Sequence, residues 1–186
     1  MARWEPDAAG RLREAALDLY VAQGYEQTTV TEIAGRAGVT ARTFFRHYAD
    51  KREVLFAGAE PLEAGMVAAL ADAPPGTAPL EAVGAALDAA AELIGGDHAH
   101  SRRRQSVIAA HPELHERELI KMSRMADALT RGLADRGVPP DQARLAAEAG
   151  IAVFRIGFER WVAGPSKGDL ATVLRESLDQ LRGLAS

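Results

Sequence analysis

Apolar residues recur every three to four positions along almost the whole chain, and this spacing constrains the fold more than any other feature. In the first such segment the repeated positions are Leu12, Ala15, Ala16, Leu19 and Ala22. This period puts one apolar stripe along a helix. The alternation of apolar and polar residues that marks strands is nearly absent. The sequence therefore predicts an all-α protein.

Three short helices are predicted before residue 50. A glycine at position 24 follows the first segment, where a left-handed residue commonly ends a helix. Thr29 can cap the amide of Glu32, whose carboxylate can reach back to the Thr29 amide, so a second helix begins there. Gly38 ends that helix, and Thr40 is a candidate cap for a third helix through Tyr48. Three short helices with a glycine turn before the third predict a helix-turn-helix.

Longer helical segments follow from about Lys51 onward. Their breaks contain glycine and proline, and the clearest loop is 73–79. The helices expected after this point span a segment around Pro61 to Leu70 and then about 80–95, 99–110, 112–136, 140–163 and 169–184.

Composition limits the classes of protein that the chain can represent. The 186 residues include no cysteine, which excludes disulfides, thiolate metal sites and a cysteine nucleophile. No apolar run approaches the roughly 20 residues that span a bilayer. Residues 1–7 lack the apolar stretch of a signal peptide. We therefore expect a cytoplasmic protein with no membrane partner.

Charge is distributed unevenly along the chain. The net charge is −4, and all of it lies in residues 57–186, because residues 1–56 contain equal numbers of acidic and basic side chains. Residues 36–52 carry a local charge of +4. A basic surface on an acidic protein is typical of phosphate binding confined to one face, although a solvated surface has the same composition.

The segment 28–55 resembles the DNA-binding domain of the TetR family. The resemblance rests on the pair Ile33-Ala34, the turn 37–39, the aromatic run Thr-Phe-Phe-Arg-His-Tyr at 43–48, and Lys51 at the start of the next helix. It implies a helix-turn-helix DNA-binding domain at 1–56 and a helical ligand-binding and dimerisation domain at 57–186. It also implies a homodimeric transcriptional regulator, usually a repressor that a small-molecule ligand releases from a near-palindromic operator.

The resemblance also implies which residues contact double-stranded DNA. In chain order they are Thr28, Thr29, Arg36, Ala41, Arg42, Thr43, Phe45, Arg46, His47 and Lys51. Arg42 and Thr43 correspond to readers of base edges, and Ala41 can touch a thymine methyl group. Phosphate contacts correspond to Thr28, Thr29, His47 and Lys51, which Arg36 can join. Phe45 stands where many family members have a tyrosine whose hydroxyl reaches a phosphate.

The last two helices are expected to form the dimer. Each subunit would contribute 140–163 and 169–184 to a four-helix bundle across a two-fold axis. The final helix carries an apolar stripe at Leu170, Val173, Leu174, Leu178, Leu181 and Leu184. Packing of this stripe within one chain is the alternative.

A ligand pocket is expected among the helices between residues 61 and 163. Candidate ligand contacts are Met66, Leu70, Leu87, Arg103, Met122, Met125, Phe154 and Phe158. The apolar members can equally be plain core, and the arginine run 102–104 can be a solvated face or can hold phosphate or carboxylate groups. The segment from Ser101 to Arg117 and the aromatic stretch 154–161 are similar to TetR-type regulators of acyl-CoA-like ligands, so an acyl-CoA-like or hydrophobic ligand is expected.

Two other classes of protein fit parts of the sequence. The histidine pairs 98/100 and 111/115 raise the possibility of a metal-responsive regulator, but the sequence offers no third ligand arm, so no metal site and no cofactor are expected. A helical interaction protein that does not bind DNA would have no need of residues 28–55. Motifs of hydrolases and nucleotide-binding enzymes are lacking, so we expect no enzymatic activity.

Overall fold

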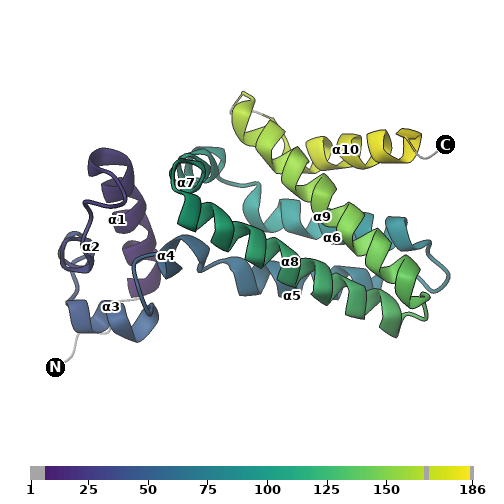
Figure 1. Cartoon of the computed structure of the whole chain (residues 1–186), viewed down its shortest axis with the longest axis horizontal. Coiled ribbons are helices and arrows are strands. Elements are labelled where there is room, and N and C mark those ends of the chain that lie inside the picture. The colour runs from purple at the N-terminus through teal and green to yellow at the C-terminus, as the bar shows by residue number, and fades with distance from the viewer. Residues whose placement is uncertain (1–6, 166–167, 185–186) are drawn as a thin grey trace. The chain divides into compact units, whose positions relative to one another are not determined.

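The computed structural model describes residues 7–165 and 168–184, and all regular structure in these ranges is α-helical (Figure 1). The prediction of an all-α fold is therefore confirmed. The helices, in chain order, are α1 (Ala8–Gln23), α2 (Val30–Arg36), α3 (Ala41–His47), α4 (Glu53–Phe56), α5 (Ala59–Asp72), α6 (Pro79–Ile94), α7 (His98–Ala110), α8 (Pro112–Asp135), α9 (Pro140–Ala163) and α10 (Leu170–Leu184).

The chain forms two compact units. The N-terminal unit contains the residues up to Gly58 together with Arg103–His115, and the larger unit contains Ala59–Arg102 and the residues from Glu116 onward. The boundary therefore passes through α7 and through the start of α8. A separation at residue 56 into DNA-binding and ligand-binding domains stays a prediction, but the segment 103–115 packs with the first four helices.

Local sequence explains the helix ends of the N-terminal unit. Gly24 closes α1 with a φ of 93°, and its amide donates to the Tyr20 carbonyl. Thr29 and Glu32 form the expected capping box at the start of α2. Gly38 turns the chain into α3 with a φ of 70°, a conformation that a residue with a Cβ rarely adopts. The three-helix prediction is confirmed at each of these ends.

The core of the N-terminal unit draws on four helices near the chain start and on a distant segment. Leu12, Ile33 and Phe44 are fully buried in it, from α1, α2 and α3 respectively. Ile108 of α7 and Leu114 of α8 are also fully buried in the same cluster. Burial of each large apolar side chain stabilises a fold by about 1.5–3 kcal/mol. The segment 103–115 is thus an integral part of this unit.

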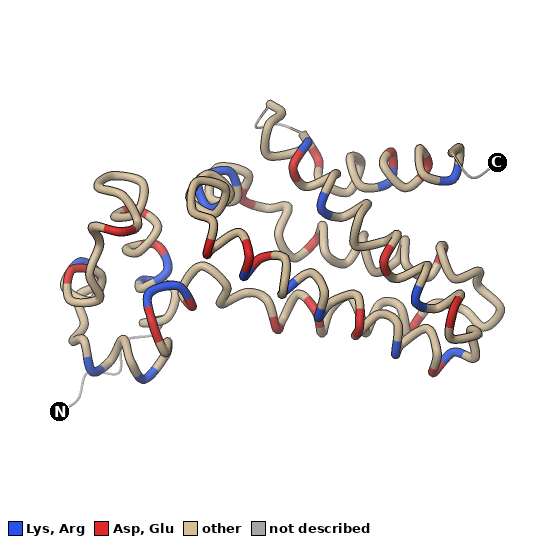
Figure 2. Tube along the Cα trace, in the orientation of Figure 1, with Lys and Arg blue, Asp and Glu red and all other residues tan. Residues whose placement is uncertain are grey.

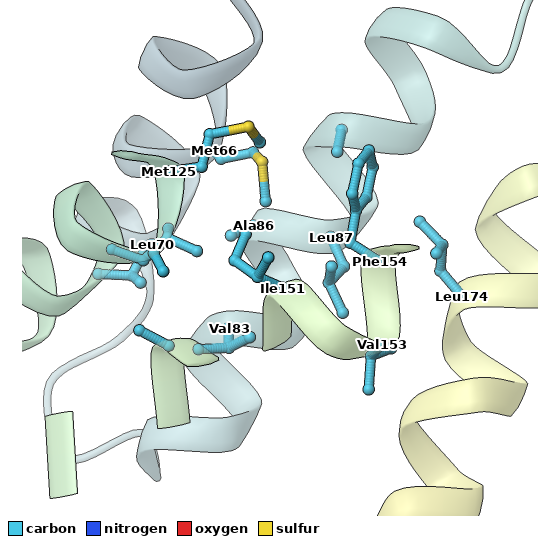
Figure 3. Packing of buried hydrophobic residues seen from close by; sticks show 14 of the residues in the cluster. Met66, Leu70, Val83, Ala86, Leu87, Met125, Ile151, Val153, Phe154 and Leu174 are labelled. Carbon is cyan, nitrogen blue, oxygen red and sulfur yellow. The ribbon is translucent and has the colours of Figure 1, made fainter. Parts of the chain in front are cut away.

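The larger unit is a bundle in which α6 packs against α5, α9 and α10. Figure 3 shows buried side chains of α5, α6, α8, α9 and α10 gathered in its core. Two glycines of α9 permit close packing, since an added Cβ would lie 2.3 Å from Val83 Cγ1 at Gly150 and 2.6 Å from Leu174 Cδ2 at Gly157. No ordinary contact between carbon atoms is that short, so α6 and α10 approach α9 closely because these positions lack a side chain.

The apolar stripe of α10 packs mainly within the chain. Leu170, Leu174 and Leu178 are buried in the core of the larger unit, whereas Leu184 is exposed. Most of the stripe therefore packs within one chain, which was the alternative to packing across the dimer. Large apolar side chains of α9 stay exposed instead, at Leu145 and Ile156.

One segment is long and apolar enough to cross a membrane by length and composition alone, contrary to the expectation from the sequence. It covers Glu53–Asp72, with a mean hydropathy of 1.4 over its most apolar window. Core helices of soluble proteins meet the same criterion, so the finding is weak evidence. Its largest side chains include Phe56 and Met66, which are buried in the cores of the two units.

Candidate nucleic-acid interface

The start of α3 is fixed by hydroxyl groups. The Thr40 Oγ1 accepts a hydrogen bond from the Thr43 amide at 3.1 Å and lies 3.1 Å from the Thr43 hydroxyl. Such a cap satisfies one of the free amides at a helix N-terminus. At the other end Tyr48 is buried and donates its hydroxyl to the Ala9 carbonyl at 3.2 Å. Both ends of α3 are thereby held in place.

Burial of Phe44 determines which side of α3 faces outward. With that ring fully buried, Arg42, Phe45 and Arg46 are exposed, and Ala41 is half-buried. The α3 segment contains arginines but no acidic residue, as Figure 2 shows. In the described part of the chain neither Arg42 nor Arg46 forms an ion pair, so both guanidinium groups are available to an anion or a base edge. His47 is exposed at the end of the helix, with its ring 6.2 Å from that of Tyr48.

The two threonines before α2 occupy different environments. Thr29 is exposed, and its hydroxyl accepts from the Glu32 amide at 3.2 Å. Thr28 is only 1% exposed, and its hydroxyl donates to the Gly24 carbonyl at 2.8 Å. The Thr29 hydroxyl also donates to Glu32 Oε2 at 2.8 Å, so a contact with phosphate needs this hydrogen bond to break but leaves the fold unchanged. A contact with the Thr28 hydroxyl needs the turn to open, so its assigned role stays a prediction without geometric support.

Lys51 donates hydrogen bonds to the backbone of the turn before α2. Its Nζ donates to the carbonyls of Tyr25, Glu26 and Thr28 at 2.8, 3.2 and 3.1 Å. The ammonium group also lies 4.3 Å from the centroid of the Tyr25 ring, a cation–π arrangement. Lys51 therefore fastens the turn to the start of the next helix, and its assignment to a phosphate stays untested.

One carboxylate, that of Asp18, binds both Arg36 and Arg103. Arg36 was expected to contact DNA, and Arg103 was expected to contact the ligand. Arg36 donates to Asp18 Oδ2 at 2.9 Å, and Arg103 donates to Asp18 Oδ1. These hydrogen bonds, that from Arg36 first, lower the pKa of Asp18 below its ordinary value of 3.8. Arg103 thus belongs to the N-terminal unit, whereas the apolar residues expected to line a pocket with it belong to the larger unit.

The neighbouring arginine also binds within the N-terminal unit. Arg104 Nε donates to the Leu55 carbonyl at 2.6 Å, and its guanidinium lies 5.3 Å from the centroid of the Phe56 ring. Together with Asp18, these contacts join α7 to α1 and α4. Sequence analysis missed Asp18 entirely, because only the three-dimensional structure brings an acidic residue on α1 to the arginine run.

The apolar ligand candidates lie in the larger unit. They are Met66, Leu70, Leu87, Met122, Met125, Phe154 and Phe158. All are buried except Phe158, which is half-buried and stacks on Phe154 with ring centroids 6.0 Å apart. The structure therefore brings these seven together as core, and a ligand among them would have to displace core packing.

Two of the histidines are engaged within their own units. His98 is buried, with Nε2 2.9 Å from the Trp161 carbonyl oxygen, and His111 has Nδ1 2.8 Å from that of Val107. Among the described residues no group of three His, Asp or Glu side chains is arranged to hold a metal ion.

Comparisons with known proteins agree on one family. The profile described as "Bacterial regulatory proteins, tetR family" matches residues 12–57, and the profile described as "MftR C-terminal domain" matches residues 77–185. The chain is 34% identical over 184 residues to the HTH-type transcriptional regulator TcmR of Streptomyces glaucescens, with 92% of this chain and 81% of that protein covered.

Solved structures of similar fold include the TetR family regulator PfmR of Thermus thermophilus, with 25% identity, a TM-score of 0.53, and 91% of this chain and 95% of that chain covered. FadR of Bacillus subtilis, in complex with stearoyl-CoA, has 20% identity and a TM-score of 0.64, with 92% and 96% covered. FadR of Thermus thermophilus, in complex with lauroyl-CoA, has 24% identity and a TM-score of 0.56, with 93% and 92% covered. The profile matches and the identity to TcmR show that this chain belongs to the TetR family of DNA-binding transcriptional regulators.

Proposed function

We propose that the chain is a homodimeric repressor that a small-molecule ligand releases from a near-palindromic operator. The observation that carries this proposal is the outward face of α3, where Arg42 and Arg46 are exposed and have no acidic partner among the described residues. A helix of this kind fits the major groove, and an arginine there can bind guanine through two hydrogen bonds. Phosphate contacts from Thr29 and His47 would fix its register.

The proposed dimer uses α9 and α10. Leu145 is 73% exposed and Ile156 is 47% exposed, and Ala149 and Ala152 lie between them on the same side of α9 at intervals of three and four residues. Small residues between large ones let two helices approach closely. Since most of the α10 stripe is buried within the chain, α9 provides the main apolar face, and Leu184 is the exposed large apolar side chain of α10.

The proposed ligand is hydrophobic or acyl-CoA-like and binds within the larger unit. Methionine side chains at Met66 and Met125 support this assignment, because an unbranched thioether repacks readily around an inserted apolar group. The complexes of the two FadR proteins with stearoyl-CoA and lauroyl-CoA point to the same chemistry. A ligand shifts the protein away from operator binding only by its difference in affinity between the two states. We place this activity in the cytoplasm and propose no enzymatic role.

Fluorescence anisotropy with labelled duplexes tests the proposal. The protein is titrated into DNA from upstream of its own gene and into a scrambled duplex at two salt concentrations. We expect selective, salt-dependent binding with two protomers per site. The variant Arg42→Ala should lose about 1–3 kcal/mol of discrimination, whereas Arg131→Ala, an exposed arginine of α8, should change nothing.

Binding that does not distinguish any upstream region from scrambled DNA would contradict the proposal. It would favour the helical interaction protein as the alternative. Release of operator by a metal chelator or by divalent metal, with no effect of acyl-CoA, would favour a metal-responsive regulator.

A further inference from the structure

We propose that Phe45 reads the methyl group of a thymine in each operator half-site, an inference that rests on the proposed operator binding. The Phe45 side chain belongs to the α3 face that approaches DNA, yet it is 58% exposed in the free protein. Removal of a large apolar group from water lowers the free energy, and here more than half of the Phe45 side chain stays in contact with solvent.

The neighbouring ring fixes the direction of Phe45. Its ring packs edge-on against that of the fully buried Phe44, with centroids 5.5 Å apart and an interplanar angle of 83°. Such edge-to-face pairs hold a defined geometry. Phe45 is therefore presented outward from a fixed base.

The helical register places Phe45 next to Arg42 and Arg46, which form no ion pair with any of the described residues. Arg42 precedes it by three residues and Arg46 follows it by one, so all three lie on the exposed side of α3. Ala41, four residues earlier, continues the apolar part of this side. The exposed surface of α3 thus offers an apolar strip with guanidinium groups along one edge.

Chemistry then narrows what Phe45 can contact. A phenyl ring has no oxygen or nitrogen, so it cannot donate a hydrogen bond to a phosphate. In the major groove the thymine 5-methyl group is the apolar feature that distinguishes one base pair from another, and phenylalanine is a known type of partner for it. With Arg42 and Arg46 beside the ring, the thymine should neighbour a guanine or a phosphate contact. Phe45 is thus assigned as a specificity-determining residue.

Thymine-to-deoxyuridine scanning tests this assignment directly, because it removes one methyl group and leaves every hydrogen-bonding group in place. The probe is the upstream duplex that wild-type protein binds selectively. We expect one thymine per half-site whose replacement weakens binding about fourfold, the equivalent of one buried methyl group. Replacement in both half-sites should weaken binding about fifteenfold if the two effects add.

Two variants connect that methyl group to Phe45. Phe45→Ala should bind thymine and deoxyuridine duplexes equally at the sensitive position, whereas Phe45→Tyr, which keeps the ring, should retain the difference. At the same position, 5-methylcytosine should bind wild type more tightly than cytosine and should give Phe45→Ala no advantage. Circular dichroism of both variants checks that the exposed position leaves the fold intact.

Each contrary result is distinct. If wild type binds a duplex selectively but no thymine responds to methyl removal, the assignment is wrong while operator binding stands. Equal loss of affinity by Phe45→Ala on operator and scrambled DNA would instead place the ring against the sugar-phosphate backbone. If no duplex is bound selectively, the proposed function fails, and the inference fails with it.

Discussion

A lysine in a DNA-binding domain can stabilise the protein fold and make no contact with DNA. Lys51 has the contacts expected of such a residue. Its ammonium group meets three backbone carbonyls of the turn before α2 and the face of Tyr25. Burial raises the pKa of Tyr25 to about 12, so this ring stays neutral at physiological pH. The lysine is thus held by oxygen dipoles and an aromatic face.

Replacement of Lys51 by methionine should therefore lower stability before it affects DNA recognition. The expected loss in the free energy of unfolding is about 1–3 kcal/mol, because the part-buried carbonyls of Tyr25 and Thr28 would lose their charged donor. Urea unfolding followed by circular dichroism measures it. Arg46→Met, which removes an exposed and unpaired charge, should change stability by less than about 0.5 kcal/mol. If Lys51→Met keeps wild-type stability but binds all DNA sequences more weakly, Lys51 contacts a phosphate and does not stabilise the turn.

For single residues, the sequence indicated what kind of group a side chain can bind, but not which group it contacts in the folded protein. Thr28, Lys51 and Arg103 are residues that commonly bind phosphates, and nothing in the local sequence distinguishes them from Thr29 or Arg42. Their neighbours come from other helices, so burial and pairing depend on tertiary packing. Caps behave differently, because both partners lie within four residues. The Thr29–Glu32 box was predictable for that reason.

At the scale of elements, Asp18 joins three helices. It accepts hydrogen bonds from Arg36 of α2 and Arg103 of α7, and these lower its pKa below 3.8. A carboxyl group with a lowered pKa in the folded state stabilises the fold above its unfolded pKa, and this stabilisation disappears as the pH falls through the folded pKa. The side chain is 37% exposed, so solvent screens much of the effect.

Asp18→Asn should consequently be less stable than wild type at pH 7, and the difference should shrink as the pH falls below about 4. Urea midpoints measured between pH 7 and pH 3 report this convergence. Asp127→Asn, at an exposed position of α8, provides the matched control and should show no such trend. A gap between wild type and Asp18→Asn that persists unchanged at pH 3 would mean that the carboxylate charge does not produce the stabilisation.

Close packing of α9 against α6 gives a second prediction at this scale. Gly150→Ala would place a Cβ 2.3 Å from the branched Val83 side chain, which cannot rotate away easily. We expect a loss of about 1–3 kcal/mol, as for other overpacked cores. Gly183→Ala on α10 meets nothing within 4 Å and should not reduce stability. Equal thermal melting of Gly150→Ala and wild type would show that α6 moves aside without cost.

Helix positions were predictable to within a few residues, because apolar period, glycine and proline are local signals. The predicted helix 112–136 is Pro112–Asp135, and 140–163 is Pro140–Ala163. The placement of 103–115 with the first four helices was not predictable. It depends on contacts such as Arg104 with Leu55, whose partners are 49 residues apart.

At the scale of the whole molecule, the proposed operator binding needs two copies of the chain. The helix α3 has seven residues and so extends about 10 Å, enough to contact only a few base pairs. Two such helices on one duplex multiply the discrimination of each, provided that the dimer holds them one helical turn of DNA apart. In the proposed complex, the contact between subunits is therefore as important to specificity as the proposed base contact of Arg42.

Ile156→Arg tests whether α9 forms that contact. The charge would be buried at an apolar interface without a partner, so the variant should become monomeric and lose most of its operator affinity. Because Ile156 is 47% exposed in the single chain, thermal unfolding of the monomer should still be cooperative. Analytical ultracentrifugation measures the association. Leu119→Arg, at a 46% exposed position on α8, should stay dimeric. If Leu119→Arg dissociates while Ile156→Arg stays dimeric, the subunits pair through α8 and the proposed α9 interface is wrong.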